Sequence, residues 1–255
     1  MTTFVIAWKD FRYLVTSSVF LVISAVAACL WSFSFLRQVL EFAGRSLAGP
    51  MMGASPDQLN IHYTVFVSHI WMTNILLVIF IPAFTMRLLA EEKRNRTYDL
   101  LLTSPITATH IALGKFIAGF GVSMIFVLIS FLYPLGTSLF VDFAMAPLLT
   151  TYAGVVLLAA LYSAIGVFSS SLTESALFAV VLGVIFNLAL WFVTQGSEMT
   201  NNAVLSAILE QISIGQQFVT FIRGTLQISA IVFFLSAIAL FVFLTQRVIE
   251  SSRWR

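Results

Sequence analysis

The sequence contains few charged residues. Only 9% of its 255 residues are Asp, Glu, Lys or Arg, whereas 60% are hydrophobic, and the mean hydropathy is +1.00. A soluble domain usually carries about 25% charged residues, which form its polar surface. The composition therefore excludes a soluble all-helical protein. The net charge is only +2, and no basic stripe interleaved with aromatic residues is present, so no nucleic-acid partner is expected.

The motifs of enzyme chemistry are also missing. Cys29 stands alone, so no intrachain disulfide is possible. No G-x-x-x-x-G-K-[ST] phosphate loop occurs, because Gly114-Lys115 lacks the earlier glycine and the following Ser or Thr. His62 and His69 would lie about 10 Å apart along a helix, too far to bind one metal without other ligands. We therefore predict no catalytic residue, metal or cofactor bound by this chain.

The sequence does contain six long apolar stretches. A helix rises 1.5 Å per residue and the hydrocarbon core is about 30 Å thick, so about 20 apolar residues span a bilayer. The stretches are continuously apolar, and a lipid-exposed backbone must satisfy its own hydrogen bonds, which favours helices over a β-barrel. We predict an all-α polytopic membrane protein in which residues 1–255 form one transmembrane domain. The predicted spans cover about residues 14–36, 63–88, 111–139, 148–169, 176–194 and 225–245.

Lysine and arginine residues are unevenly placed between these spans. If the N-terminus is cytoplasmic, ten of the 13 positive residues lie on the cytoplasmic side. Positive residues are concentrated in the cytoplasmic loops of membrane proteins. The distribution predicts that both termini are cytoplasmic, which agrees with an even number of spans. The ten are Lys9, Arg12, Arg87, Lys93, Arg94, Arg96, Lys115, Arg247, Arg253 and Arg255, and the other three are Arg37, Arg45 and Arg223.

The segment before the first span has an amphipathic pattern. Phe4, Trp8 and Phe11 recur at helical spacing, with Lys9 and Arg12 among the polar residues between them. This pattern favours an interfacial helix that contacts membrane lipid along the inner leaflet. The alternative is an ordinary cytoplasmic extension of the first span.

Two external segments are predicted to differ in structure. Gly44 and Pro50 are turn signals within residues 37–62, where we predict an external loop. Residues 195–224 are too polar to span the membrane but contain apolar residues at helical spacing. We predict one or two short helices there that enter the outer leaflet, with a plain surface helix as the alternative.

The cytoplasmic segment 91–110 begins with charges and continues with leucines. Thr97 can cap a short helix, in which Tyr98, Leu101 and Leu102 share one face. The residue before a proline avoids helical geometry, so Ser104-Pro105 ends this helix. Such a unit is suited to docking in a partner's groove, with flanking charges fixing its orientation; a solvated loop that only sets topology leaves the leucines unexplained. The residues assigned to this coupling role are Glu91, Glu92, Arg94, Thr97, Tyr98, Leu101, Leu102, Ser104 and Pro105.

This segment resembles the corresponding run of type-2 ABC transporter permeases. In that family, acidic residues, basic residues and Gly-Thr precede a leucine-rich stretch that ends in Thr-Ser-Pro. Arg96 stands where the family commonly has glycine, and residues 113–116 match further downstream. Residues 8–11 and the stretch from Ser213 to Gly224 resemble the gliding-motility branch. The resemblance covers nearly the whole chain.

The resemblance implies a permease subunit of an ATP-driven transporter in the bacterial cytoplasmic (inner) membrane. Its implied partners are an ABC ATPase dimer that binds ATP and Mg²⁺, a second identical or related permease copy, and an auxiliary periplasmic subunit. The first, second and fifth spans are the candidates for the face between the two copies. The expected output is export or gliding-type mechanical work. A non-transporting membrane scaffold and an ion-driven secondary transporter are the alternatives; the latter predicts inverted repeats and mid-membrane charges, which are not evident.

Asn74 and Asn187 are polar residues within the second and fifth predicted spans. Polar residues inside a membrane usually face other helices or a cavity. These two residues are predicted either to line a substrate path or to bond neighbouring helices, and the sequence favours neither alternative.

Overall fold

The computed structural model describes residues 2–52, 60–103, 105–199 and 209–253, and within these ranges it is helical without strands. Six of the described helices are long and apolar enough to cross a membrane. The predicted all-α polytopic fold is therefore confirmed. The elements are α1 (Thr2–Val15), α2 (Ser18–Met52), the π-helical turn η2 (His62–Phe66), α3 (Val67–Arg94), α4 (Tyr98–Thr103), α5 (Ala108–Thr137), α6 (Met145–Leu172), α7 (Ala176–Met199), α9 (Ile214–Ile222) and α10 (Ile228–Ser252).

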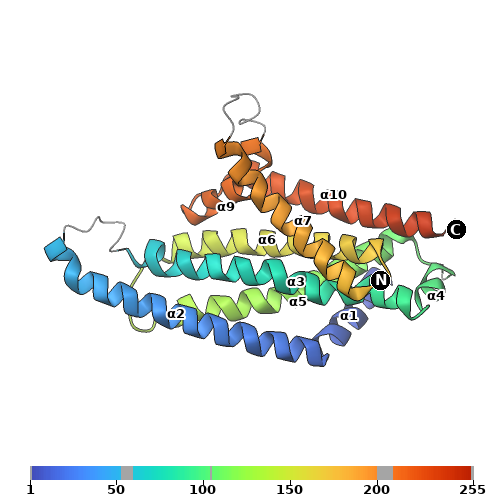
Figure 1. Ribbon diagram of the computed structural model, residues 1–255, viewed down its shortest axis with the longest axis horizontal. Coiled ribbons are helices and arrows are strands. Elements are labelled where there is room, and N and C mark those ends of the chain that lie inside the picture. Colours follow the sequence, from blue (N-terminus) through green and yellow to red (C-terminus); the bar gives the residue numbers. More distant parts are fainter. Residues whose placement is uncertain (1, 53–59, 104, 200–208, 254–255) are drawn as a thin grey trace.

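The long helices form an elongated bundle with two distinct ends (Figure 1). One end, called the α4 end below, carries α1, α4 and both ends of the chain (Figure 1). The opposite end, called the far end, carries the last turns of α2 and the connection from α5 to α6 (Figure 1). The described residues of the two regions that sequence patterns single out, segment 91–110 and residues 37–62, therefore lie at opposite ends of the bundle.

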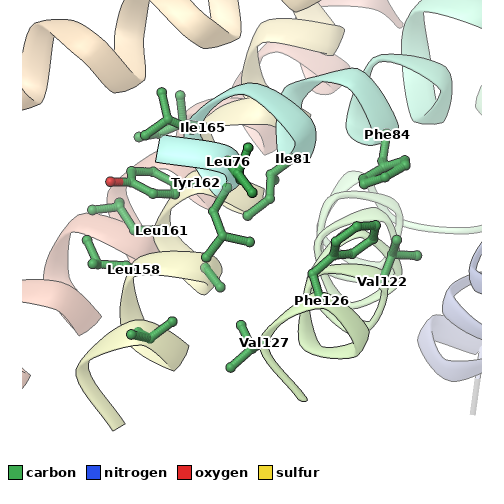
Figure 2. Packing of buried hydrophobic residues seen from close by; sticks show 14 of the residues in the cluster. Leu76, Ile81, Phe84, Val122, Phe126, Val127, Leu158, Leu161, Tyr162 and Ile165 are labelled. Atoms are coloured by element: carbon green, nitrogen blue, oxygen red, sulfur yellow. The ribbon is translucent and has the colours of Figure 1, made fainter. Parts of the chain in front are cut away.

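The core of the bundle is formed by α3, α5 and α6. In its most apolar stretch α6 is 78% buried, against 17% for α2, α7 and α10, so α6 is central and these three helices are peripheral. Figure 2 shows side chains such as Phe84, Phe126 and Tyr162 packed between the central helices. Because lipid is as apolar as a leucine side chain, close packing rather than exclusion of water holds such helices together.

The first predicted span begins later than expected because the chain bends between α1 and α2. Ser17 Oγ accepts a hydrogen bond from the backbone N–H of Phe20 at 3.2 Å, which is the arrangement of a helix N-cap. The break separates α1 as a helix of its own, and the first membrane helix starts at Ser18 rather than at residue 14.

The predicted external loop over residues 37–62 is wrong in its first part, because α2 continues as a helix to Met52. Two ion pairs one helical turn apart support this extension. Arg37 Nε lies 2.7 Å from Glu41 Oε1, and Arg45 Nη2 lies 3.8 Å from Glu41 Oε2. Such pairs favour a helix and offset the turn signal of Gly44. Residues 53–59 of the predicted loop lie outside the described residues.

The segment 195–224 contains a short helix, α9, as predicted. Ser213 caps it by accepting a hydrogen bond from Gln216 N at 3.1 Å. Its buried side includes Phe218 and Phe221, and it packs on α6 and α7. His62 Nε2 lies 3.1 Å from Ile222 O, which links the end of α9 to the start of the second membrane helix. Residues 200–208 of the predicted segment lie outside the described part of the chain.

Candidate functional site

The turn that leads into α4 is a Schellman motif at the end of α3. Arg96 N donates to Lys93 O at 3.1 Å, and Thr97 N donates to Glu92 O at 3.0 Å, which are the two bonds of that motif. Arg96 has φ of 57°, a left-handed conformation that glycine adopts at little steric cost. This geometry explains why glycine suits the position. The Thr97 hydroxyl also donates to Glu92 O, so the observed contact of Thr97 completes α3.

The face of α4 that carries Tyr98, Leu101 and Leu102 packs against the chain itself. Tyr98 is only 5% exposed, and both leucines are partly buried against the main apolar cluster. Burial raises the pKa of the Tyr98 phenol, which therefore stays neutral at physiological pH. The three side chains share one face, as predicted, but they seat α4 on the bundle rather than project toward a partner. A six-residue helix is marginal alone, so it uses its apolar face for support.

The outward face of α4 carries Asp99, Leu100 and Thr103, and Leu100 is 72% exposed. Arg94, at the end of α3, is also exposed. The sequence pattern did not single out Leu100, because helical spacing separates it from the Tyr98 face but does not show which of the two faces points outward. The short helix thus presents one large apolar side chain, with charged and polar neighbours, at the α4 end.

Two further contacts fix the segment on either side of α4. The Lys93 ammonium donates to Ser171 O at the end of α6, and the Arg253 guanidinium donates to Ile106 O. Thr107 caps α5 by accepting a hydrogen bond from His110 N at 3.3 Å. Pro105 is exposed in the bend, and Ser104 lies outside the described residues. The segment is therefore attached to α3, α5, α6 and α10.

A buried charge cluster joins α1, α3 and α5 beside this segment. Lys115 Nζ lies 2.9 Å from Asp10 Oδ2 and 2.6 Å from Glu92 Oε1, and the Lys115 side chain is 1% exposed. Lys9 approaches Glu92 Oε1 at 3.8 Å from the surface. An ammonium group is costly to bury without partners. The cluster therefore stabilises one particular arrangement of the three helices.

Glu91 belongs to a second, adjacent cluster. Arg87 Nε lies 3.0 Å from Glu91 Oε1, and the Tyr13 hydroxyl donates to Glu91 Oε2 at 3.3 Å. Arg87 Nη2 also donates to the Tyr13 hydroxyl at 3.0 Å. Glu91 and Glu92, predicted as orienting charges for a partner, are thus engaged by cations of their own chain.

α1 packs closely on α5 and exposes aromatic residues on its other side. A Cβ added at Gly114 would lie 2.9 Å from Ile6 Cγ2, so a side chain there would push α1 away. Phe11, predicted to face lipid, is instead partly buried against the core. Phe4 and Trp8 are 69% and 54% exposed, one helical turn apart. The exposed aromatic face of α1 therefore consists of Phe4 and Trp8 without Phe11.

Asn74 and Asn187 both bond neighbouring helices. The Tyr162 hydroxyl donates to Asn74 Oδ1 at 2.8 Å and in turn accepts from the indole N–H of Trp191. Asn187 Nδ2 donates to Val78 O at 3.3 Å. Both amide side chains are buried inside the single chain. These contacts favour the interhelical alternative over a substrate path.

The fold and the α4 end together define a polytopic membrane protein with a short, firmly seated helix between its second and third spans. Among known families, the model described as "ABC-2 family transporter protein" matches residues 4–255. The chain therefore belongs to the ABC-2 transporter family and is a permease subunit of an ABC transporter. Members of this family normally work with an ABC ATPase partner. No curated protein matches the chain.

Proposed function

We propose that the chain couples ATP hydrolysis on a separate ATPase dimer to movement of its own membrane spans. The observation that carries this proposal is the position of α4. Its inner face is packed on the bundle, while Leu100 on its outer face is 72% exposed at the end where both chain termini lie. A helix held on one side and open on the other transmits the displacement of a docked partner to the helices that hold it.

Leu100 is the proposed contact with the ATPase, and Arg94 and Asp99 flank it. Burying a leucine side chain contributes roughly 1.5–3 kcal/mol, so Leu100→Ser should weaken ATPase binding by about 10- to 100-fold. The permease should still fold, because this side chain makes little contact with the bundle. The double change of Leu101 and Leu102 to Ser should act differently, by unseating α4.

The test is co-purification of the ATPase encoded beside this chain, together with its ATP turnover. Leu226→Ser is the matched control, because Leu226 is also exposed (59%) but precedes α10 at the opposite end of that helix from Ser252. Leu100→Ser should lose ATPase and activity, whereas Leu226→Ser should keep both. Full ATPase recovery and activity in Leu100→Ser would refute the proposed contact.

The charge clusters are the proposed route from α4 to the membrane spans and to α1. Glu91 and Glu92 lie in the last turns of α3, directly before the Schellman turn. Their partners Tyr13 and Lys9 belong to α1, and Lys115, which also pairs with Asp10 of α1, belongs to α5. A displacement of α4 therefore acts on three helices at once. Glu91 and Glu92 keep a coupling role in this proposal, exerted through their own chain.

α1 is proposed to lie in the membrane interface through Phe4 and Trp8. Arg12 lies exposed on the same stretch and is proposed to bind lipid phosphates, and Lys9 adds a second exposed positive charge there. Aromatic side chains on one face with basic residues beside them are typical of interfacial helices. The proposal places the α4 end, with most lysine and arginine residues, at the cytoplasmic side of the inner membrane.

Two permease copies are proposed to meet along α2, α3 and α7, with the transport path between them. α2 and α7 each pack on α3, and Ile75 and Ile79 of α3 remain 54% and 46% exposed. Purification with the ATPase should give a complex of two permeases and two ATPases; an active complex with one permease would contradict this. Export or gliding-type work, and an auxiliary periplasmic subunit, remain proposals that rest on the sequence resemblance.

A further inference from the structure

An apolar cavity of approximately 1340 Å³ lies at the far end, between α2, α5, the α5–α6 connection and the start of the second membrane helix at residues 60–65. It lies where the two helices differ in reach: α5 ends at Thr137, whereas α2 continues to Met52 and extends past the neighbouring helices (Figure 1). The volume exceeds the roughly 300–1,000 Å³ of pockets for drug-sized ligands. This cavity is called the far-end groove below.

The lining of the far-end groove extends along α2 past the part of that helix that carries no charged residue. The first charged residue of α2 is Arg37, so residues 18–36 form its apolar part, about 28 Å long and equal to a bilayer core. Ser32 and Phe35 line the groove within this apolar part, whereas Phe42 and Ser46 line it beyond Arg37. Ser46 lies about 14 Å further along the helix axis than Arg37.

α2 keeps an apolar face toward the groove over its whole length there. The lining positions Phe35, Val39 and Phe42 recur at helical spacing. Arg37 and Glu41, together with Arg45, fall on the opposite face and pair with one another. Beyond the hydrocarbon region such a face requires an apolar partner, since water is a poor solvent for it.

The two ends of the groove differ in polarity. At the inner end the hydroxyls of Ser32 and Tyr133 lie 2.8 Å apart, and Tyr133 donates to Ala28 O at 3.2 Å. The two hydroxyls are thus hydrogen-bonded within the protein, and the apolar atoms of these side chains remain as the surface that a ligand would contact. At the outer end Phe140 is 87% exposed, and Asp142 is the one charged residue among the described lining residues.

We propose that the far-end groove binds the acyl chains of a phospholipid with an ammonium-bearing headgroup, partly lifted from the adjoining leaflet. The groove is continuous with the hydrocarbon region, so an acyl chain enters it without crossing water. Its walls beyond Arg37 replace the contacts that the acyl chain has in the bilayer, and the Asp142 carboxylate is complementary to the ammonium group of the lipid. The site goes beyond the coupling role and does not depend on where the ATPase docks.

Two glycines provide a matched pair of variants for the test. A Cβ added at Gly136 or at Gly44 would meet nothing within 4 Å, so both positions are open to a side chain. Gly136 lines the groove, whereas Gly44 is on α2 outside the lining. Gly136→Trp should therefore fill the groove, and Gly44→Trp should add the same bulk outside it. Leu139→Glu is a second variant, because Leu139 lines the groove with a side chain that is 82% exposed.

The probe is phosphatidylethanolamine with a photoactivatable group on its acyl chain, reconstituted with the full-length protein in nanodiscs. Wild type and Gly44→Trp should be labelled on residues 139–143 and on α2 beyond Arg37. Gly136→Trp and Leu139→Glu should reduce this labelling about tenfold, because excluding two methylene groups from apolar surface changes binding by that factor. The same probe with a phosphatidylglycerol headgroup should label less, and Asp142→Asn should remove that difference.

Several results would overturn the proposal. Labelling confined to α2 before Arg37 would show that the acyl chains of the lipid stay in the bilayer. Equal labelling by both headgroups would remove the role of Asp142. A change in dimerisation of Gly136→Trp with unchanged labelling would make the groove an interface between two copies of this chain.

Discussion

Replacing Lys115 with Met removes the ammonium group that lies between two buried carboxylates. Asp10 and Glu92 are 5% and 16% exposed in their side chains and approach Lys115 at 2.9 and 2.6 Å. Removing one partner of a buried ion pair costs about 3–5 kcal/mol, because the remaining charges stay buried without compensation. Separation of α1 from α5 relieves that cost by exposing Asp10. We therefore expect the equilibrium constant for detachment of α1 from α5 to rise by about 100-fold or more.

The assay is the rate of thiol labelling at Ala7→Cys, in a Cys29→Ser background. Ala7 is 4% exposed in α1, so its thiol should be protected in the parent and labelled rapidly with Lys115→Met. Lys9→Met is the control, since Lys9 is 65% exposed and such surface pairs contribute little. Neutralising Asp10 and Glu92 as well should restore protection. Protection and melting temperature unchanged in Lys115→Met would refute the role of the cluster.

Three further changes test separate features of the chain. Arg96→Gly should raise the free energy of unfolding by about 1 kcal/mol, because the left-handed backbone no longer carries a side chain; a lower melting temperature would contradict the Schellman assignment. Gly114→Leu should displace α1 and speed its proteolysis, whereas unchanged proteolysis would argue against the close contact. Single cysteines are placed at Ser46 or Ser252 in a protein without Cys29, and intact cells are treated with an impermeant thiol reagent. The reagent should label position 46 and not position 252. Labelling at position 252 would reverse the proposed topology.

The six spans could be predicted from the sequence because a continuous apolar stretch of membrane length has few alternatives. The extension of α2 could not be predicted from turn residues alone. Gly44 and Pro50 indicate a loop, but the two pairs that Glu41 forms with arginines one turn away support a helix. The four-residue spacing of Glu41 from Arg37 and from Arg45 is the feature of the sequence that indicates the longer α2.

The candidate site could be predicted in part. The shared face of Tyr98, Leu101 and Leu102 follows from helical spacing, but spacing does not say whether a face meets the chain or a partner. The cluster of Asp10, Glu92 and Lys115 joins positions far apart in sequence, and such pairings depend on the tertiary arrangement. The local sign of this cluster in the sequence is Lys115, a lysine that stands among the apolar residues of a membrane helix.

Photo-crosslinking from position 100 tests the central claim most directly. A photoreactive amino acid is placed at Leu100, or at Leu226 as the control, and the permease is expressed with its neighbouring ATPase. The coupling role of α4 predicts a covalent permease–ATPase product from position 100 and none from position 226. Absence of that product from position 100, in a complex that still hydrolyses ATP, would contradict the account.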